Sequence, residues 1–422
     1  MYTLKDVKNV FNKWLYLREN YTFIAPICAV LSNFLNADPD IFFIVTKSGG
    51  TKTEVIRAFG SEENNYVYPV SKFTPQTLIS GQKISVKEKD KPKTKEQIVK
   101  ARKTMDMAGR LDNRILAIKD FTTILAMNPQ DISLIFSDFR EMTDGYLKKD
   151  FGNGVQVSYK MHSSVITGCT GAIESQHLQV TSTLGQRMIM FKPISKLSKT
   201  ENENLMHSAV KNIQDKKQLR DEIHKVTYGY VSQIIEDKNF REMDINSYIT
   251  KKASKKLMEA TAFVSTARTY VRKNYHGDIE DQPEVEAPTR LYSSICKLVS
   301  IHAYINKRTK VNKRDIKFGI RILHDNIPTR YLLAMNVLLK AKKLKNKSMT
   351  TPMISEIYKL PNTTVRRILF DLEALGILKH NQDINYENEG QNTPYEWEYV
   401  YPEKNLNDES VITTNSKYLI GD

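Results

Sequence analysis

The chain has 422 residues, enough for two or three domains that each bury a core. Its 63 lysines and arginines against 48 aspartates and glutamates give a net charge of +15, which favours an anionic partner, nucleic acid before membrane. The three cysteines are scattered and form no CxxC pair, so we expect a reducing, cytoplasmic setting without a disulfide framework or zinc ribbon. The longest apolar stretch, 24–35, contains a proline and is too short to span a bilayer. The first residues lack the uncharged core of a secretory signal.

The first half of the chain predicts an N-terminal helical segment, 1–40, followed by an α/β core, 41–195. Apolar side chains recur at helical spacing between Val7 and Leu15, and 24–36 forms a second helix. The remaining predicted elements are a strand at 41–45, a helix at 54–60, and strands at 115–118 and 164–166. Strands that alternate with helical stretches indicate a parallel sheet.

The second half predicts a helical lid region over 196–340, because helical periodicity with charged faces replaces the strand signal. Its clearest helices are at 246–276 and 288–306, and the acidic stretch 278–287 reads as a loop between helical units. A basic linker at 340–347 leads to a compact C-terminal domain, 348–401, and a tail, 402–422.

The C-terminal domain has the pattern of a winged helix-turn-helix. A helix at 351–359, with Ile354 and Ile357 inward, is followed by a turn and a helix at 363–375 that Asn362 or Thr363 can cap. The buried face of the second helix consists of Val365, Ile368, Leu369 and Leu372, and a wing ends at 395–400. We expect the exposed side chains to contact DNA, although such domains also dock proteins: Thr364, Arg366 and Arg367.

The segment VTKSGGTKT, residues 45–53, has the layout of a phosphate-binding loop. Lys52 is expected to reach the β/γ-phosphates of ATP, and the hydroxyl of Thr53 to bind Mg²⁺. The residues expected to surround the phosphates are Ser48, Gly49, Gly50 and Thr51. Two positions usually held by glycine are Thr46 and Thr51, and a Lys-Thr pair at a helix start also occurs at an ordinary solvated helix end.

Three later residues follow in the order that a nucleotide site requires. Asp120 ends the 115–118 strand and can hold Mg²⁺, although Lys119 stands where the first acid is usual. Thr170 follows the next strand, and Arg187 can reach the γ-phosphate of a neighbouring subunit. Taken singly, each residue could equally be part of a solvated strand end or of a surface salt bridge without a function in a nucleotide site. Asp138 and Glu141 are further candidates for a catalytic base.

These segments resemble the AAA+ core of MCM-like replicative helicases of phages and mobile elements. The similar stretches are ILAIKDFTTIL, FREMTDG, VITGCTGAIE and LGQRMIMFK, and further on APTRLYSSICKL and VNKRDI, which resemble the lid of that family. The resemblance covers about residues 35–335. It implies a hexameric ring of identical chains that binds ATP and Mg²⁺ at subunit interfaces and acts on DNA with other replication proteins.

The resemblance also implies a role for each matched residue. Thr53 and Asp120 would serve the metal, and Thr170 would be the sensor of the γ-phosphate. Arg187 would be the arginine finger acting in trans, and Arg290 the second sensor. Residues 146–162 correspond to the pre-sensor hairpin, with a turn at 152–154, and the lysines that would hold a DNA backbone are Lys148, Lys149 and Lys160. A solvated loop is the alternative for this segment.

The sequence departs from the family in two respects. We expect no counterpart of the zinc-containing N-terminal DNA-binding domain in residues 1–40, and Thr46, Thr51 and Lys119 predict slow hydrolysis more than lost nucleotide binding. We therefore expect an ATP-dependent DNA helicase or translocase of a virus or mobile element. The alternatives are a DNA-binding initiator, loader or regulator switched by nucleotide, and a winged-helix protein whose α/β core only supports oligomerisation.

Overall fold

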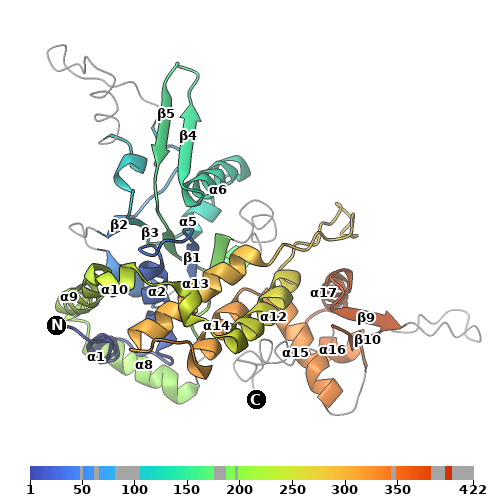
Figure 1. Cartoon of the computed structure of the whole chain (residues 1–422). Helices are drawn as coiled ribbons and strands as arrows, with labels where there is room; N and C mark the ends of the chain where they lie inside the picture. The colour runs from blue at the N-terminus through green and yellow to red at the C-terminus, as the bar shows by residue number, and fades with distance from the viewer. Residues whose placement is uncertain are drawn as a thin grey trace, which may run out of the picture. The chain divides into compact units, whose positions relative to one another are not determined.

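A computed structural model of the chain shows a mixed α/β fold around a parallel sheet (Figure 1). It describes residues 1–47, 51–60, 66–80, 105–174, 187–194, 198–343, 348–381 and 395–401. The chain divides into two compact units, Met1–Tyr248 with Lys297–Val311, and Ile249–Cys296 with Asn312–Asp422. The division differs from the expected domains because the helices between 198 and 248 belong with the sheet.

Two helices open the chain, as predicted. In α1 (Leu4–Trp14), the hydroxyl of Thr3 accepts the amide of Asp6 while the Asp6 carboxylate accepts the amide of Thr3, which closes a capping box. The apolar face of α1 packs on α9 (Lys216–Glu236), where Glu222 accepts hydrogen bonds from Lys13 and Trp14. The second helix, α2 (Tyr21–Ser32), is buried along most of its length and ends four residues before the expected boundary.

The central sheet has five parallel strands in the order β2–β3–β6–β1–β7. They are β1 (Ile41–Val45), β2 (Val67–Val70), β3 (Ile115–Ile118), β6 (Val165–Cys169) and β7 (Met188–Phe191). The predicted strands at 41–45 and 115–118 are confirmed, and the predicted 164–166 strand is β6, which runs on to Cys169. The two edge strands were not predicted, and in β2 a proline and two half-exposed positions obscure the apolar pattern.

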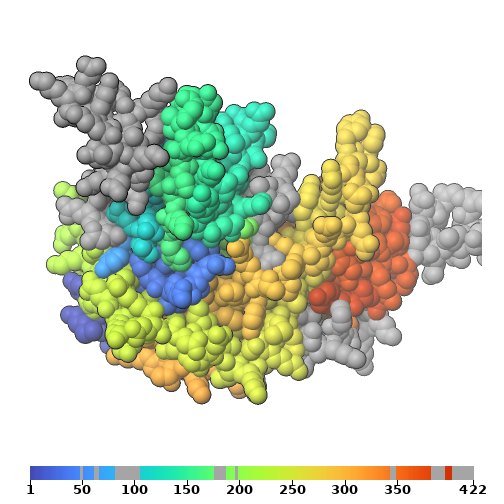
Figure 2. All heavy atoms as spheres, turned by 45° about the horizontal axis from the view of Figure 1, so that its top comes forward, coloured from blue at the N-terminus to red at the C-terminus, as the bar shows by residue number. Residues whose placement is uncertain are grey.

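Between β3 and β6 the described chain forms two helices and a hairpin. A 3₁₀ turn, Ala108–Arg110, precedes β3, and α5 (Thr122–Leu125) and α6 (Pro129–Thr143) follow it. The hairpin consists of β4 (Tyr146–Asp150) and β5 (Gln156–Lys160) and extends away from the sheet (Figures 1 and 2). Its turn includes Gly154 at φ +79°, a conformation that favours glycine. The predicted hairpin is therefore confirmed.

Four further described helices belong to the first unit. The helix after the phosphate-loop segment, α3 (Lys52–Phe59), begins two residues earlier than expected. It packs on α9 through the ion pair of Arg220 with Glu54, with an Nη2–Oε1 distance of 2.6 Å. The other helices are α8 (Lys199–Lys211), α10 (Lys238–Arg241) and α11 (Ile245–Tyr248). Because α9 is joined to both α1 and α3, this region is part of the sheet unit.

Four long helices run through the predicted lid region beyond residue 249. They are α12 (Lys251–Ala267), α13 (Thr289–Ile305), which passes from the second unit to the first, α14 (Lys313–Asp325) and α15 (Thr329–Lys343). The acidic stretch 278–287 contains no helix, as predicted, but α12 ends at Ala267 instead of near 276. The expected linker at 340–347 is wrong at its start, because α15 continues to Lys343 with Ala341 buried.

The chain after 348 forms two helices and a small antiparallel sheet. The elements are β8 (Met349–Thr350), α16 (Thr351–Tyr358), α17 (Asn362–Ala374), β9 (Leu378–Asn381) and β10 (Glu396–Tyr399), in sheet order β8–β10–β9. The predicted buried face of α17 is confirmed. Two details were wrong: Ile357 is 46% exposed, and neither Asn362 nor Thr363 caps α17, because Pro361 occupies the cap position. The tail, 402–422, lies outside the described residues.

Candidate nucleotide site and basic surfaces

The end of β1 leads into the phosphate-loop segment. The Thr46 amide donates to the carbonyl of Cys169 at 3.0 Å, which extends the contact between β1 and β6 by one residue. Ser48, Gly49 and Gly50 lie outside the described residues. The description resumes at Thr51, which precedes α3, and Lys52 and Thr53 are the first two residues of that helix. The side chains of both thus lie at the carboxyl edge of the sheet.

Lys52 is 7% exposed because its side chain lies against β6 at Gly168. A Cβ atom on Gly168 would be 3.3 Å from Lys52 Cδ, 3.0 Å from Ile56 Cδ1 and 3.1 Å from the carbonyl oxygen of Lys119. Only a residue without a side chain lets α3 approach the strand this closely. Sequence analysis missed this role, although a glycine inside a buried strand is a signal of close approach.

Asp120 and Thr170 follow adjacent strands and are joined through Thr122. The Asp120 carboxylate accepts the amide of Thr122 at 3.0 Å. The Thr122 hydroxyl accepts the amide of Thr170 at 3.3 Å, and the two hydroxyl oxygens are 3.4 Å apart. Thr122 was not among the predicted site residues. Its place between a carboxylate and a hydroxyl fixes the ends of β3 and β6 relative to each other.

The Cys169 thiol at the end of β6 is buried beside these residues. Burial raises the pKa of Cys169 to about 11, while the charge of Lys52 lowers it and that of Asp120 raises it. Both charges therefore act at the end of β6. Because the thiol stays protonated at neutral pH, Cys169 is a packing residue and not a nucleophile.

Lys119 and the two other acidic candidates, Asp138 and Glu141, form contacts outside this group of residues. Lys119, in the position usual for an acid, donates from Nζ to the hydroxyl of Ser71 at 3.3 Å. Asp138 is 4% exposed and pairs with Lys149, and burial raises the pKa of its carboxyl against the opposing effect of that lysine. Glu141 accepts the amide of Lys148 at 3.4 Å. Asp138 and Glu141 thus support the root of the hairpin.

Arg187 stands immediately before β7 and binds a carboxylate of its own chain. Its Nη2 donates to both oxygens of Asp144, at 2.6 and 2.7 Å, and its Nε donates to the same carboxylate at 3.2 Å. The side chain of Arg187 is 18% exposed. Arg290 is the second residue of α13 and belongs to the second unit, whereas Lys52, Asp120, Thr170 and Arg187 belong to the first.

The three hairpin lysines do not share one face. Tyr146 pairs with Lys160 and Lys148 pairs with Ser158, so Lys148 and Lys160 lie on the same, exposed face. Lys149 lies on the opposite face, where its ammonium binds Asp138. The geometry therefore brings together two of the predicted lysines as a basic surface and gives Lys149 a structural contact.

In the second unit, α17 presents a polar face. Thr364, Arg366 and Arg367 are exposed, as predicted. The guanidinium of Arg366 lies 4.6 Å from the ring centroid of Tyr395, and its Nη2 donates to the Tyr395 hydroxyl at 3.0 Å. This contact holds Arg366 in one orientation. Arg367 lies close to Gly277, where an added Cβ would be 3.6 Å from its guanidinium carbon.

Gly277 belongs to a short ordered turn that sequence analysis missed. Lys273 and Ile279 form an antiparallel bridge, and at the tip Tyr275 is 93% exposed, with its ring centroid 4.2 Å from that of His276. Lys273 pairs with the buried Asp371 of α17 at 2.6 Å, which fixes the turn beside that helix (Figure 2). The adjacent aromatic residues in KNYHGD were the available signal. We call residues 273–279 the aromatic turn.

No protein-family model matches the sequence, and a search of curated proteins gives no match either. None of the described helices is long and apolar enough to cross a membrane. Within the described ranges, no group of three or more His, Cys, Asp and Glu side chains could hold a metal ion.

Proposed function

We propose that the chain is an ATP-dependent DNA helicase or translocase, an MCM-like AAA+ motor that acts as a hexameric ring in the replication of a virus or mobile element. The observation that carries this proposal is the position of Lys52, Asp120 and Thr170. They follow β1, β3 and β6, three neighbouring parallel strands, at one edge of the sheet. Ligands of open parallel α/β sheets bind at this carboxyl edge.

The chemistry of these residues suits a nucleotide with Mg²⁺. The first amides of α3 and the ammonium of Lys52 favour phosphate oxygens. The Thr53 hydroxyl and Asp120 carboxylate are the oxygen ligands that Mg²⁺ prefers, and a phosphate-bound Mg²⁺ takes its other ligands from phosphates and water. Bound there, Mg²⁺ would neutralise charge on the phosphates. Thr170, held by Thr122, would contact the γ-phosphate or the attacking water.

DNA contacts are proposed on two surfaces. Lys148 and Lys160 project from the exposed face of the hairpin, where they would bind a DNA backbone inside the ring. The small C-terminal sheet with α16 and α17 supports a winged helix-turn-helix, with Thr364 and Arg367 facing DNA. The net charge of +15 favours both contacts.

The arginine finger and the second sensor would be supplied by a neighbouring copy. In this proposal Arg187 and Arg290 act in trans on the nucleotide held by Lys52 and Asp120. Asp144 orients the guanidinium of Arg187 through its two-oxygen contact. An arginine so placed stabilises charge that develops in phosphoryl transfer.

A second candidate function is a nucleotide-switched initiator, loader or regulator that hydrolyses ATP weakly. Two observations favour it: Lys119, which precedes Asp120, is directed to Ser71, and Arg187 is neutralised by Asp144. Neither prevents nucleotide binding, but both weaken the case for fast turnover. Both candidates therefore share the binding site and differ in the rate of hydrolysis.

The binding site itself is tested by titrating a fluorescent ATP analogue with Mg²⁺. Lys52→Met keeps the apolar stem of a side chain that is 7% exposed and removes its charge. We expect at least a roughly tenfold loss of affinity, because the ammonium contacts the β/γ-phosphates. Lys8→Met, at an exposed position on α1, is the matched control and should bind like the wild type. Equal affinity of all three proteins would reject both candidate functions.

A further inference from the structure

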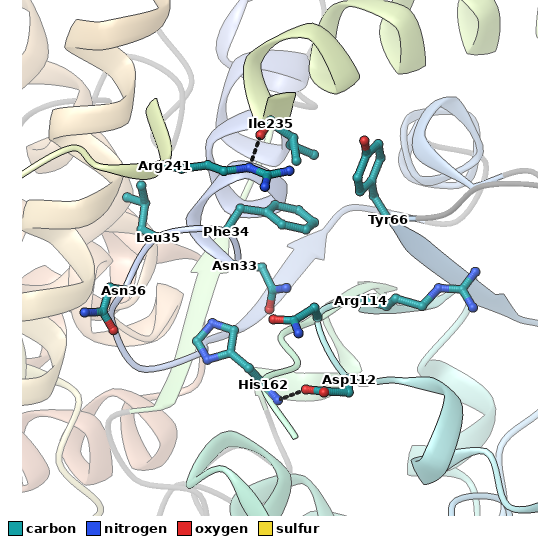
Figure 3. A pocket seen from close by; sticks show the side chains of 11 residues that line it. Asn33, Phe34, Leu35, Asn36, Tyr66, Asp112, Arg114, His162, Ile235 and Arg241 are labelled. Atoms are coloured by element: carbon teal, nitrogen blue, oxygen red, sulfur yellow. Dashed lines mark hydrogen bonds between the residues drawn. The ribbon is translucent and has the colours of Figure 1, made fainter. Parts of the chain in front are cut away.

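A cavity of about 820 Å³ lies in the first unit at the amino-terminal edge of the central sheet. Its walls come from the segments that precede β1, β2, β3 and β6 and from the end of α9 with α10, so it lies opposite the edge that carries Lys52 (Figure 3). The side chains used below are Asn33, Phe34, Tyr66, Arg114, His162 and Arg241. The volume is in the range of small-molecule sites.

The cavity presents a buried amide nitrogen and a buried imidazole nitrogen that have no hydrogen-bond partner among the described residues. Asn33 is 2% exposed; its Oδ1 accepts the amide of Ser164 at 2.7 Å, which leaves Nδ2 without an acceptor. The Nε2 atom of His162 is also unpaired. Burial lowers the pKa of this imidazole, so the ring is neutral at pH 7. Since buried polar atoms in native proteins are nearly always paired, an amide donor and an imidazole nitrogen remain for a ligand.

The same cavity offers aromatic and cationic groups. The rings of Phe34 and Tyr66 meet edge to face, with centroids 5.5 Å apart. Arg241 donates from Nε to the carbonyl of Ile235 at 2.6 Å, which fixes its guanidinium close to Phe34 (Figure 3). The guanidinium of Arg114 points away from Asn33 and His162 and lies 5.2 Å from the ring centroid of Tyr68 (Figure 3). Two carboxylates lie at the walls: Asp112 accepts the amide of His162, and Glu236 accepts the hydroxyl of Tyr66 at 3.1 Å. The cation that lies beside the aromatic rings is Arg241, so an anionic group joined to a planar ring fits this side of the cavity.

We propose that this cavity binds a nucleotide unit, one base with one phosphate. The edge of the base pairs with Asn33 Nδ2 and His162 Nε2, its ring contacts Phe34 and Tyr66, and its phosphate meets the guanidinium of Arg241. A simple anion would leave the amide and imidazole atoms unpaired. The unit comes either from a free mononucleotide or from a nucleotide of a single strand. The inference is independent of the proposed ATP site.

The position of the cavity gives such a ligand a contact with the hairpin. His162 follows β5 by two residues, and Met161 before it donates its amide to the carbonyl of Gly145, immediately before β4. A bound nucleotide unit therefore touches the segment that joins the hairpin to β6.

The test is binding of a fluorescent derivative of AMP, which lacks the β- and γ-phosphates that a phosphate loop holds. The protein background is Lys52→Met, so that the proposed ATP site does not contribute. Asn33→Asp keeps the Oδ1 acceptor for Ser164 and replaces the Nδ2 donor by an anionic oxygen. Arg241→Gln, at an exposed position, removes the charge with little risk to folding. Asn246→Asp adds the same charge as Asn33→Asp on an exposed helix and is the control.

We expect at least tenfold weaker binding for Asn33→Asp and Arg241→Gln, and unchanged binding for Asn246→Asp. Competition by unlabelled oligo(dT) assigns the site to a single strand, and lack of competition assigns it to a free mononucleotide. The proposal is overturned if neither the AMP derivative nor labelled oligo(dT) binds, or if their binding is unchanged in both Asn33→Asp and Arg241→Gln. A matched urea midpoint for each variant separates loss of the ligand from loss of the fold.

Discussion

Two residues without a catalytic group hold the candidate nucleotide site together. Gly168 lets the Lys52 stem and α3 lie against β6, and Thr122 connects Asp120 to Thr170 through hydrogen bonds. Neither belongs to a phosphate-loop motif. The functional residues are therefore positioned by packing and by a short threonine bridge, and substitutions at these supports should be felt at the site.

Gly168→Ala should destabilise the protein and weaken nucleotide binding. The added methyl group would lie 3.1 Å from the Lys119 carbonyl oxygen and 3.3 Å from Lys52 Cδ, and backbone cannot move away easily. The expected loss of unfolding free energy is about 1–3 kcal/mol, measured by urea denaturation. Gly171→Ala is the control, since no atom lies within 4 Å of its added Cβ. Equal stability of the two variants would contradict this role of Gly168.

His162 should make stability depend on pH. Burial lowers the pKa of its imidazole from 6.5, and the Lys297 charge acts in the same direction, while a backbone hydrogen bond with Asn33 and the charges of Asp112 and Asp38 oppose the shift. The unfolded chain then binds the proton more readily than the folded one. The stability contributed by neutral His162 is present above pH 6.5 and is lost as the pH falls through the folded-state pKa.

The check is the urea midpoint at pH 7.5 and pH 5.5. The midpoint of the wild type should fall on acidification, and that of His162→Asn should fall less, because the group that resists protonation is gone. An equal or larger fall in the variant would contradict the assignment. Other titrating groups are common to both proteins and cancel in the comparison.

At the scale of elements, the pleat of the β4–β5 hairpin separates the two lysines proposed to bind DNA from a lysine with a structural contact. Lys148 and Lys160 share the exposed face, while Lys149 faces inward to the buried Asp138. The sequence could predict the hairpin from its glycine turn, but it could not divide the lysines between the faces, because that depends on the register of the two strands.

Lys148→Ala with Lys160→Ala should weaken DNA binding and reduce its dependence on salt. Each lost phosphate contact lowers the slope of log K against log salt by about 0.7 for single strands. Fluorescence anisotropy at several salt concentrations measures both quantities. Lys149→Ala should keep the slope and instead lose about 1–3 kcal/mol of unfolding free energy, because Asp138 is left buried without its partner. A lower salt slope in Lys149→Ala, or an unchanged slope in the double variant, would contradict this division of the lysines between the two faces.

The aromatic turn should add to DNA binding beside α17. Tyr275→Ala removes a ring that is 93% exposed, so folding should be unaffected, whereas stacking on a base is worth about 1–3 kcal/mol. Because that free energy corresponds to about a tenfold change in affinity, we expect single-stranded DNA to bind roughly tenfold more weakly. Tyr275→Phe keeps the ring and should bind like the wild type. Unchanged binding by Tyr275→Ala would show that the turn takes no part.

At the scale of the whole molecule, sequence patterns predicted the parallel sheet, its three inner strands and the helices on both sides of residue 200. They failed where an element is too short to show a periodic pattern, and where contacts between distant residues determine the structure. The edge strand Val67–Val70 contains a proline, and α15 runs past its expected end. The role of Thr122 depends on its hydrogen bonds with Asp120 and Thr170, which follow two different strands. The grouping of α9 with the sheet follows from its packing on α1 and α3, which includes the Arg220–Glu54 ion pair and which no local pattern reveals.

In the proposed ring motor, each active site would combine Lys52 of one copy with Arg187 of the next. Lys52→Met and Arg187→Ala should therefore each abolish activity alone, while a mixture restores some interfaces with both residues intact. An arginine finger contributes about 10³–10⁵ in turnover, so even a minority of restored interfaces is measurable.

The measurement that tests this most directly is ATP hydrolysis, with and without single-stranded DNA, by the wild type, the two variants and their equimolar mixture. The account predicts DNA-stimulated turnover by the wild type, loss of at least about a hundredfold in each variant, and partial recovery in the mixture. Wild-type protein that binds ATP without DNA-stimulated turnover, or a mixture as inactive as its components, would contradict it.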